Sequence, residues 1–316
     1  MAHEDAVAVG IDVGGTKLVG LAVTARGEVC ERRRVESPRD DERRLLDTII
    51  GLARDLGDDV PTGLAIAGIV ARDGTLRYSP NLHLTDVPLR AALVDALPGP
   101  VAVLNDATAA LAGEAALGAA RGRRDVVLLT LGTGVGGGIL ADGVLVEGAN
   151  GMGAELGHMV VEDGGRPCPC GNRGCLEAYA SGSAIGLMGL QRARAEPDHT
   201  TLDEVPVVEG KRVTEAALAG DRVGIEVLRE AGYWLGVGLT SLVNVLDPEL
   251  VVIGGGAAST AFPLMAREAV RVMSSRVIGA PYRRLPDVVP AELGDDAGAL
   301  GAAVRALALA GAEVTA

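Results

Sequence analysis

The chain has 316 residues, of which 48% are hydrophobic, so it is long enough for two globular domains that each bury a core. Its net charge of −13 argues against nucleic acid or an anionic membrane as a partner, and its aromatic content of 2% argues against base stacking. The first residues are acidic, unlike a secretory signal, and no long uncharged apolar run occurs. We therefore expect a cytoplasmic protein with reduced thiols.

The first predicted unit is a strand, a glycine turn and a second strand. Residues 7–11 are apolar, residues 12–17 read Asp-Val-Gly-Gly-Thr-Lys, and a returning strand is expected near residues 18–23. Paired glycines allow bare backbone N–H groups to approach an anion. The loop is not a Walker A motif, because Thr precedes Lys and no helix follows. A plain hairpin turn is the alternative.

Residues 101–106 predict a strand that ends in Asn105 and Asp106, ahead of an Ala-rich helix at residues 107–120. These two polar residues can cap the helix, and a carboxylate at the carboxyl end of a strand is also placed where α/β proteins bind ligands. Because a helix N-terminus stabilises an ionised acid, we expect Asp106 to be a weak, deprotonated base. Phosphoryl transfer tolerates a weak base, since it depends mainly on positioning.

The strand, glycine turn and strand pattern occurs again further along the chain. Residues 126–131 are an apolar strand, residues 132–138 are rich in glycine, and Asp142-Gly143 predicts a hairpin turn between returning strands. Two such units indicate duplicated halves, whose glycine turns could together hold a polyphosphate. Two structural hairpins are the alternative.

Three of the four cysteines lie close together, at Cys168, Cys170 and Cys175. A disulfide explains them poorly, because one proline separates the first two and three thiols always leave one unpaired. With His158 they make a four-ligand set typical of structural zinc, which leaves no open position for an activated water. Glu155 and Glu177 would then be acids beside a rigid loop. The alternative is a reduced, cysteine-rich surface loop.

The last part of the chain predicts a helix near residues 225–246 and then a strand at residues 250–253 that runs into Gly254, Gly255 and Gly256. Such a turn suits close approach of the backbone to a nucleotide base or ribose, although a structural turn is the alternative. Asp295 and Asp296 are expected to cap a final helix that ends near Leu309.

These pieces together resemble the ROK family of bacterial sugar kinases and repressors. The resemblance covers almost the whole chain, and its most specific part is the Glu-x-Gly-His and Cys-x-Cys-Gly-x2-Gly-Cys-x-Glu combination. The matching segments are residues 12–17, 104–106, 131–137, 155–158, 168–177 and 252–256.

The resemblance implies a two-domain α/β fold of the actin-like ATPase (ribonuclease H-like) type with an interdomain cleft. It implies a small domain of residues 1–107 completed by about 298–316, and a large domain of residues 108–297 with the zinc loop. Bound groups would be ATP, Mg²⁺ and structural Zn²⁺, and the assembly a homodimer or homotetramer.

The resemblance also implies roles for individual residues in phosphorylation of glucose at its 6-hydroxyl. Asp106 would be the general base, and Asp12 would help to place magnesium. The ring hydroxyls would be held by Asn81, Asn105, Glu155, His158 and Glu177; the phosphates by Gly14, Gly15, Thr16, Lys17, Gly132, Thr133 and Gly134; the adenosine by Gly254, Gly255 and Gly256; and zinc by His158, Cys168, Cys170 and Cys175.

Other functions stay open within this resemblance. The protein could phosphorylate fructose, mannose or N-acetylglucosamine, could use polyphosphate in place of ATP, or could be a sugar sensor without catalysis. Repressors of the family carry a helix-turn-helix domain ahead of the first glycine loop, and only 11 residues precede Asp12. We therefore expect no DNA binding by this chain.

Overall fold

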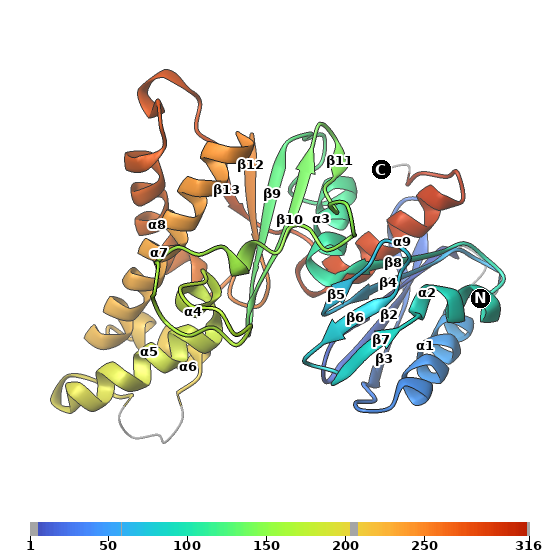
Figure 1. Cartoon of the computed structure of the whole chain (residues 1–316), viewed down its shortest axis with the longest axis horizontal. Coiled ribbons are helices and arrows are strands. Elements are labelled where there is room, and N and C mark those ends of the chain that lie inside the picture. Colours follow the sequence, from blue (N-terminus) through green and yellow to red (C-terminus); the bar gives the residue numbers. More distant parts are fainter. Residues whose placement is uncertain (1–5, 58, 203–207, 315–316) are drawn as a thin grey trace. The chain divides into compact units, whose positions relative to one another are not determined.

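The computed structural model describes residues 6–57, 59–202 and 208–314, which form an α/β protein with two compact units (Figure 1). The first unit contains the described residues within Met1–Arg123, Gly138–Ala154 and Glu292–Ala316, and the second those within Arg124–Gly137 and Glu155–Ala291. Among the described helices, none is long and apolar enough to cross a membrane. The prediction of a cytoplasmic protein used the acidic first five residues, and these lie outside the described residues.

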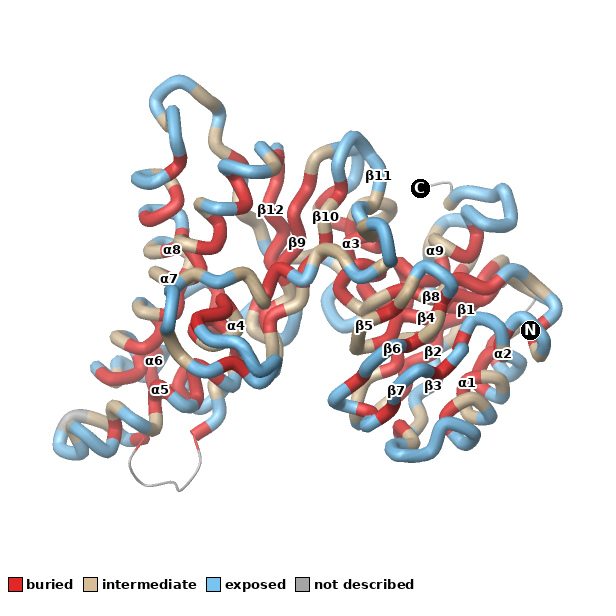
Figure 2. Tube along the Cα trace, in the orientation of Figure 1, coloured by how far each residue is buried: buried red, intermediate tan, exposed pale blue. Residues whose placement is uncertain are grey.

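The first sheet has the strand order β3-β2-β1-β4-β8, with β1 antiparallel to β2 and parallel to β4. Its buried central strands carry apolar residues on both faces, because helices cover both (Figure 2). Val9 and Ile11 of β1 pack in one core with α1, whereas Ala8 packs in another with α9, as the period of two requires. The elements are β1 (Ala6–Val13), β2 (Lys17–Thr24), β3 (Val29–Glu36), α1 (Glu42–Leu56), β4 (Thr62–Ile66), α2 (Leu89–Ala96), β8 (Val101–Asn105), α3 (Asp106–Leu117), η4 (Gly294–Asp296) and α9 (Ala297–Leu309).

Helix α9 approaches the first sheet unusually closely. A Cβ atom added at Gly10 or Gly63 would collide with the carbonyl oxygens of Ala299 or Ala302 on this helix. On its other side α9 packs against α3 (Figure 1). In the division into compact units, residues 108–123 belong to the first unit. The domain boundaries expected at residues 107 and 298 stay a prediction.

The first unit also contains a small antiparallel sheet of order β5-β6-β7. Its strands are short because turns interrupt them, and the turn after β6 contains Asn81. The strands are β5 (Ile69–Val70), β6 (Leu76–Ser79) and β7 (Leu84–Val87).

The second large sheet has the order β11-β10-β9-β12-β13, the same arrangement as the first with β9 in the place of β1. Strand β12 is parallel to both β9 and β13, as β4 is to β1 and β8. This matching order supports the prediction of duplicated halves. Asp142 and Gly143 have φ of 49° and 77°, which confirms the expected hairpin turn. The strands are β9 (Val126–Leu131), β10 (Val135–Ala141), β11 (Val144–Leu145), β12 (Leu250–Gly254) and β13 (Asp287–Pro290).

Helices make up most of the second unit, and the long helix α7 runs beside α8 (Figure 1). Asp221 caps α7 by accepting the N–H of Gly224 at 2.9 Å, and the helix ends where Asp247 adopts a left-handed conformation with φ of 47°. The elements are η1 (Leu156–His158), α4 (Glu177–Ala180), α5 (Gly182–Ala195), η2 (Pro197–His199), α6 (Gly210–Leu218), α7 (Arg222–Leu246), α8 (Phe262–Arg276) and η3 (Ala280–Tyr282).

Candidate active site

Asp106 lies where β8 ends and α3 begins. Its Oδ1 accepts the N–H of Ala107 and the Nδ2–H of Asn105, each at 3.0 Å. Burial nevertheless raises the pKa of the Asp106 carboxyl above its ordinary value, against the lowering effect of these hydrogen bonds. The backbone N–H groups at the start of the helix favour the ionised carboxylate, as expected, but desolvation is the larger effect, so the pKa is raised and the expectation of a weak base was wrong.

Asn105 is the N-cap of α3. Its Oδ1 accepts the N–H groups of Ala107 and Thr108 at 3.0 and 3.1 Å, which satisfies two of the donors that a helix start leaves unpaired. Its Nδ2 donates to the Gly68 carbonyl at 3.1 Å and to Asp106. Both ends of the Asn105 amide are therefore engaged by the protein, and the residue holds Asp106 in place.

Asp12 stands near Asp106 in the same unit. Burial, the neighbouring charge of Asp106 and that of Asp295 raise the pKa of Asp12 to about 7, while the charge of Lys17 acts in the opposite direction. Two acids this close cannot both ionise at little cost unless a cation compensates them. Lys17 supplies part of that compensation, and oxygen ligands of this kind are the ones that a hard divalent ion prefers.

The start of α9 differs from the prediction. Asp296 occupies the cap position without a side-chain hydrogen bond to the helix, and instead pairs with Arg32 of β3. Asp295 acts on Asp12 through its charge. The sequence assigned both acids to capping, and their local pattern does not show that Asp295 acts on Asp12.

The first glycine turn is closed by the Gly14 N–H, which donates to the Lys17 carbonyl at 3.0 Å. Asn81 lies beside this turn: a Cβ atom at Gly15 would be 2.9 Å from the Asn81 Cβ. Asn81 and Thr16 are exposed, and Lys17 is half-buried. The first unit thus brings together the turn, Asn81, Asp12 and Asp106.

The second glycine turn lies between β9 and β10. The Gly132 carbonyl accepts the Gly182 N–H at 2.7 Å, and the Val135 N–H donates to Oε2 of Glu177 at 2.9 Å. Thr133 is exposed at the tip of the turn. Glu177, expected to contact a sugar, therefore also holds the backbone at the exit of this turn.

The third glycine turn adjoins the second. Gly255 has φ of 81°, a conformation that favours glycine, and a Cβ atom there would be 2.5 Å from the Leu131 carbonyl oxygen. The same oxygen accepts the Ala257 N–H at 3.0 Å. The two turns follow the neighbouring parallel strands β9 and β12, where α/β proteins place their ligands. Gly256 has open space around its α-carbon.

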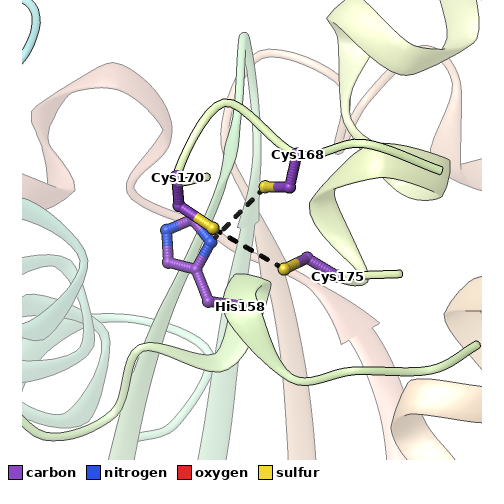
Figure 3. A group of neighbouring side chains, drawn as sticks. All are labelled: His158, Cys168, Cys170 and Cys175. Carbon is purple, nitrogen blue, oxygen red and sulfur yellow. Dashed lines mark hydrogen bonds between the residues drawn. The ribbon is translucent and has the colours of Figure 1, made fainter. Parts of the chain in front are cut away.

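His158, Cys168, Cys170 and Cys175 converge in the second unit, and their ligand atoms lie within 4.8 Å of one another (Figure 3). Cys170 Sγ is 3.7 Å from Cys175 Sγ, and Cys168 Sγ is 3.8 Å from His158 Nδ1. Two thiolates on one tetrahedral zinc, each at about 2.3 Å from the ion, lie about 3.8 Å apart, so the four residues fit zinc. Glu155, exposed just ahead of this cluster, accepts the His158 N–H through its carbonyl at 3.0 Å.

One buried acid was not singled out from the sequence. Glu114 of α3 is fully buried, and its carboxylate accepts backbone N–H groups of Ala119, Glu292 and Leu293 at 2.8, 3.2 and 2.9 Å. It ties the end of α3 to the segment that enters α9. The available signal was an acid in the interior of a helix that is otherwise Ala-rich and apolar after Asp106.

Two sheets of the same order, each with a glycine turn after its central strand, define an α/β protein of the two-domain actin-like kind. Residues 8–309 match the ROK family. A glucokinase from Streptomyces coelicolor is 35% identical over 306 residues, covering 93% of this chain and 96% of the relative. The ROK family glucokinase from Streptomyces griseus, solved in complex with glucose and AMPPNP, superposes with a TM-score of 0.81 at 35% identity, covering 94% of this chain and 97% of that one.

The chain belongs to the ROK family. A xylose repressor from Bacillus subtilis is also similar, with 28% identity over 93% of this chain and 75% of the repressor. The glucokinase relatives support a sugar kinase, which is the function that the arrangement of acids and glycine turns also favours.

Proposed function

We propose that this protein phosphorylates glucose at its 6-hydroxyl with ATP, giving glucose 6-phosphate and ADP. The observation that carries the proposal is Asp106, an acid of raised pKa fixed by Asn105 at the carboxyl end of β8, in the same unit as the first glycine turn. The glucokinase relatives, one of them solved with glucose and AMPPNP, favour this sugar and this donor.

Asp106 acts as the general base. Its Oδ1 is occupied by the Ala107 and Asn105 hydrogen bonds, so Oδ2 is the oxygen that accepts the 6-hydroxyl proton. The hydroxyl oxygen then forms a bond to the γ-phosphorus, the bond from that phosphorus to the β–γ bridging oxygen breaks, and ADP leaves. A raised pKa makes the carboxylate a better proton acceptor near neutral pH than an exposed aspartate.

The other residues bind and orient. We assign the sugar hydroxyls to Asn81, Glu155, His158 and Glu177, with Asn105 positioning the base. The backbone N–H groups of the first two glycine turns are assigned to the phosphates, together with Thr16, Lys17 and Thr133, and Gly254, Gly255 and Gly256 to the adenosine. Neutral hydroxyls suit paired acids and amides, because each hydroxyl both donates and accepts.

We assign an ion to each unit. Asp12 would hold magnesium, which would neutralise charge on the phosphates. Burial and the nearby charge of Asp106 raise the pKa of Asp12 to about 7, and a bound cation would favour its ionised form. The cluster of His158 with the three cysteines would hold zinc through four protein ligands, so its contribution is to keep the loop rigid.

The test is magnesium- and ATP-dependent phosphorylation of a panel of hexoses by the wild type, Asp106→Asn and the control Asp47→Asn, an exposed acid of α1 in the same unit. We expect glucose to be the best substrate. Removing the base should lower kcat by about 10³-fold or more with a small change in KM, whereas the control keeps its activity.

The outcomes separate the open alternatives. Faster turnover of fructose, mannose or N-acetylglucosamine would keep the mechanism and change the substrate. Hexose binding without turnover, with ATP and then with polyphosphate as the donor, would favour a sugar sensor and overturn the kinase assignment. A kcat for Asp106→Asn close to that of the wild type would show that Asp106 is not the base.

A further inference from the structure

The peptide of Val135 is held from two sides by the segments that carry the zinc ligands. On one side Oε2 of Glu177, two residues after Cys175, accepts its N–H at 2.9 Å. On the other side Gly157, the residue before His158, packs so closely that a Cβ atom there would collide with the Val135 carbonyl oxygen. Val135 itself is buried and directly follows the second glycine turn.

Backbone hydrogen bonds connect the segments of the zinc loop to one another. The Leu176 N–H donates to the Met159 carbonyl at 2.9 Å, and the Val161 N–H donates to the Gly174 carbonyl at 2.8 Å. These bonds join the segment of His158 to the segment of Cys175. A metal ion shared by both segments would fix their separation, and with it the distance between Gly157 and Glu177.

The entry of the glycine turn is held by the same part of the chain. The Gly182 N–H, at the start of α5 and five residues after Glu177, donates to the Gly132 carbonyl at 2.7 Å. The turn is closed internally by the Gly132 N–H, which donates to the Gly134 carbonyl at 3.0 Å. Both ends of the turn therefore depend on the position of the segment that follows the last zinc ligand.

We propose that Glu177 is a positioning residue that couples zinc occupancy to the conformation of the second glycine turn, so that zinc and the nucleotide bind cooperatively. The nucleotide part rests on the proposed function, because it takes this turn as a phosphate site. Zinc then sets the affinity for the donor as well as the shape of the loop. Because coupling is reciprocal, the nucleotide tightens zinc by the factor by which zinc tightens the nucleotide.

Two glycines of the turn make a matched pair for the test. A Cβ atom at Gly134 would collide with Oε2 of Glu177, the mobile end of a side chain, so Gly134→Ala displaces the carboxylate from the Val135 N–H. A Cβ atom at Gly132 meets nothing within 4 Å, so Gly132→Ala changes the turn without touching Glu177. Neither glycine has a positive φ.

The first experiment measures zinc affinity of the full chain by competition with a chromogenic chelator, without nucleotide. We expect Gly134→Ala to bind zinc about tenfold more weakly than the wild type and Gly132→Ala to differ by less than about twofold. Glu177→Gln, which keeps an oxygen for the Val135 N–H, should retain more zinc affinity than Glu177→Ala. Equal zinc affinities in the two glycine variants would overturn the proposal.

The second experiment repeats the competition on the wild type with and without magnesium and AMPPNP. We expect the nucleotide to strengthen zinc binding by about fivefold or more, and zinc-stripped protein to bind AMPPNP more weakly by the same factor. A nucleotide that leaves the zinc affinity unchanged would overturn the coupling, and this result does not depend on whether Gly134→Ala folds.

The two proposals fail in different ways. If the wild type phosphorylates glucose but the glycine variants bind zinc equally, the coupling is wrong and the kinase assignment stands. The wild type could also fail to phosphorylate any hexose while Gly134→Ala, but not Gly132→Ala, binds zinc more weakly and AMPPNP strengthens zinc binding. In that case the proposed function is wrong and the coupling stands.

Discussion

Replacing Glu114 by glutamine tests whether a buried carboxylate stabilises the first unit. The carboxylate accepts three backbone N–H groups, two on Oε2 and one on Oε1, and no solvent reaches it. Glutamine has the same shape but only one oxygen, so at least one of these N–H groups would face an amide NH₂. The substitution therefore changes the hydrogen bonding and leaves the packing almost unaltered.

The magnitude follows from those contacts. A hydrogen bond to a charged acceptor contributes about 1.5–3 kcal/mol, and a buried N–H left without an acceptor costs about 1–3 kcal/mol. We expect Glu114→Gln to lower the free energy of unfolding by about 2–4 kcal/mol, counting one lost bond and partial relaxation. The exposed acid Asp47 provides the control, because Asp47→Asn should change stability by less than about 0.5 kcal/mol.

The assay needs a signal from the first unit. The single tryptophan, Trp234, belongs to the second unit, so its fluorescence would miss a transition confined to the first. Urea unfolding followed by far-UV circular dichroism, together with hydrogen exchange at the amides of Ala119 and Leu293, reports on the first unit. If Glu114→Gln unfolds at the same urea concentration as Asp47→Asn and these amides stay protected, the carboxylate does not hold this part of the fold.

Three further results are expected. The pKa of Asp12 is about 7 in the folded chain against 3.8 for an ordinary aspartate, so without metal the folded chain binds a proton that the unfolded chain has lost. The free energy of unfolding should therefore fall as the pH rises from about 4 to 7, by at most about 4 kcal/mol. Urea titrations at several pH values should show a smaller pH dependence for Asp12→Asn. Gly301→Ala, whose Cβ would collide with a carbonyl of α3, should lower the melting temperature, whereas Gly51→Ala, with open space in α1, should not. Cys170→Ser should reduce zinc well below one per chain by elemental analysis, and Cys30→Ser, outside the cluster, should retain it.

The local order of the fold could be predicted from the sequence. The two strand, glycine turn and strand units, the Asp142-Gly143 turn and the helix that ends at Leu309 were all expected, and the structure confirms them. Each depends on neighbouring residues: short continuous runs of apolar side chains for the strands, Asp-Gly for the hairpin turn, and a run of good helix formers for the last helix. The Cys and His cluster was also expected, since its ligands lie within one short stretch.

What could not be predicted depends on contacts between distant residues. The pKa of Asp106 rises because neighbouring elements bury it, and the sequence shows only the helix N-terminus that acts in the opposite direction. Asp296 pairs with Arg32, 264 residues away, instead of capping its own helix. Glu114 receives two of its donors from residues 292 and 293. These three features depend on burial and on contacts between residues far apart in the sequence, and a local sequence pattern shows neither.

The central strands of the two duplicated sheets end differently, and this difference bears on the proposed chemistry. Asp12 is the second-last residue of β1 and pairs with Ala65 of the parallel strand β4, whereas Thr130 is the second-last residue of β9 and pairs with Gly254 of the parallel strand β12. Carboxylates at both positions 12 and 130 would repel a bound polyphosphate, and hydroxyls at both positions would leave magnesium without an anionic ligand there. The acid is present only in the half that also carries Asp106. Under the proposed function, the first half would therefore supply the cation ligand and the base besides one phosphate turn, and the second half the other phosphate turn and the adenosine turn.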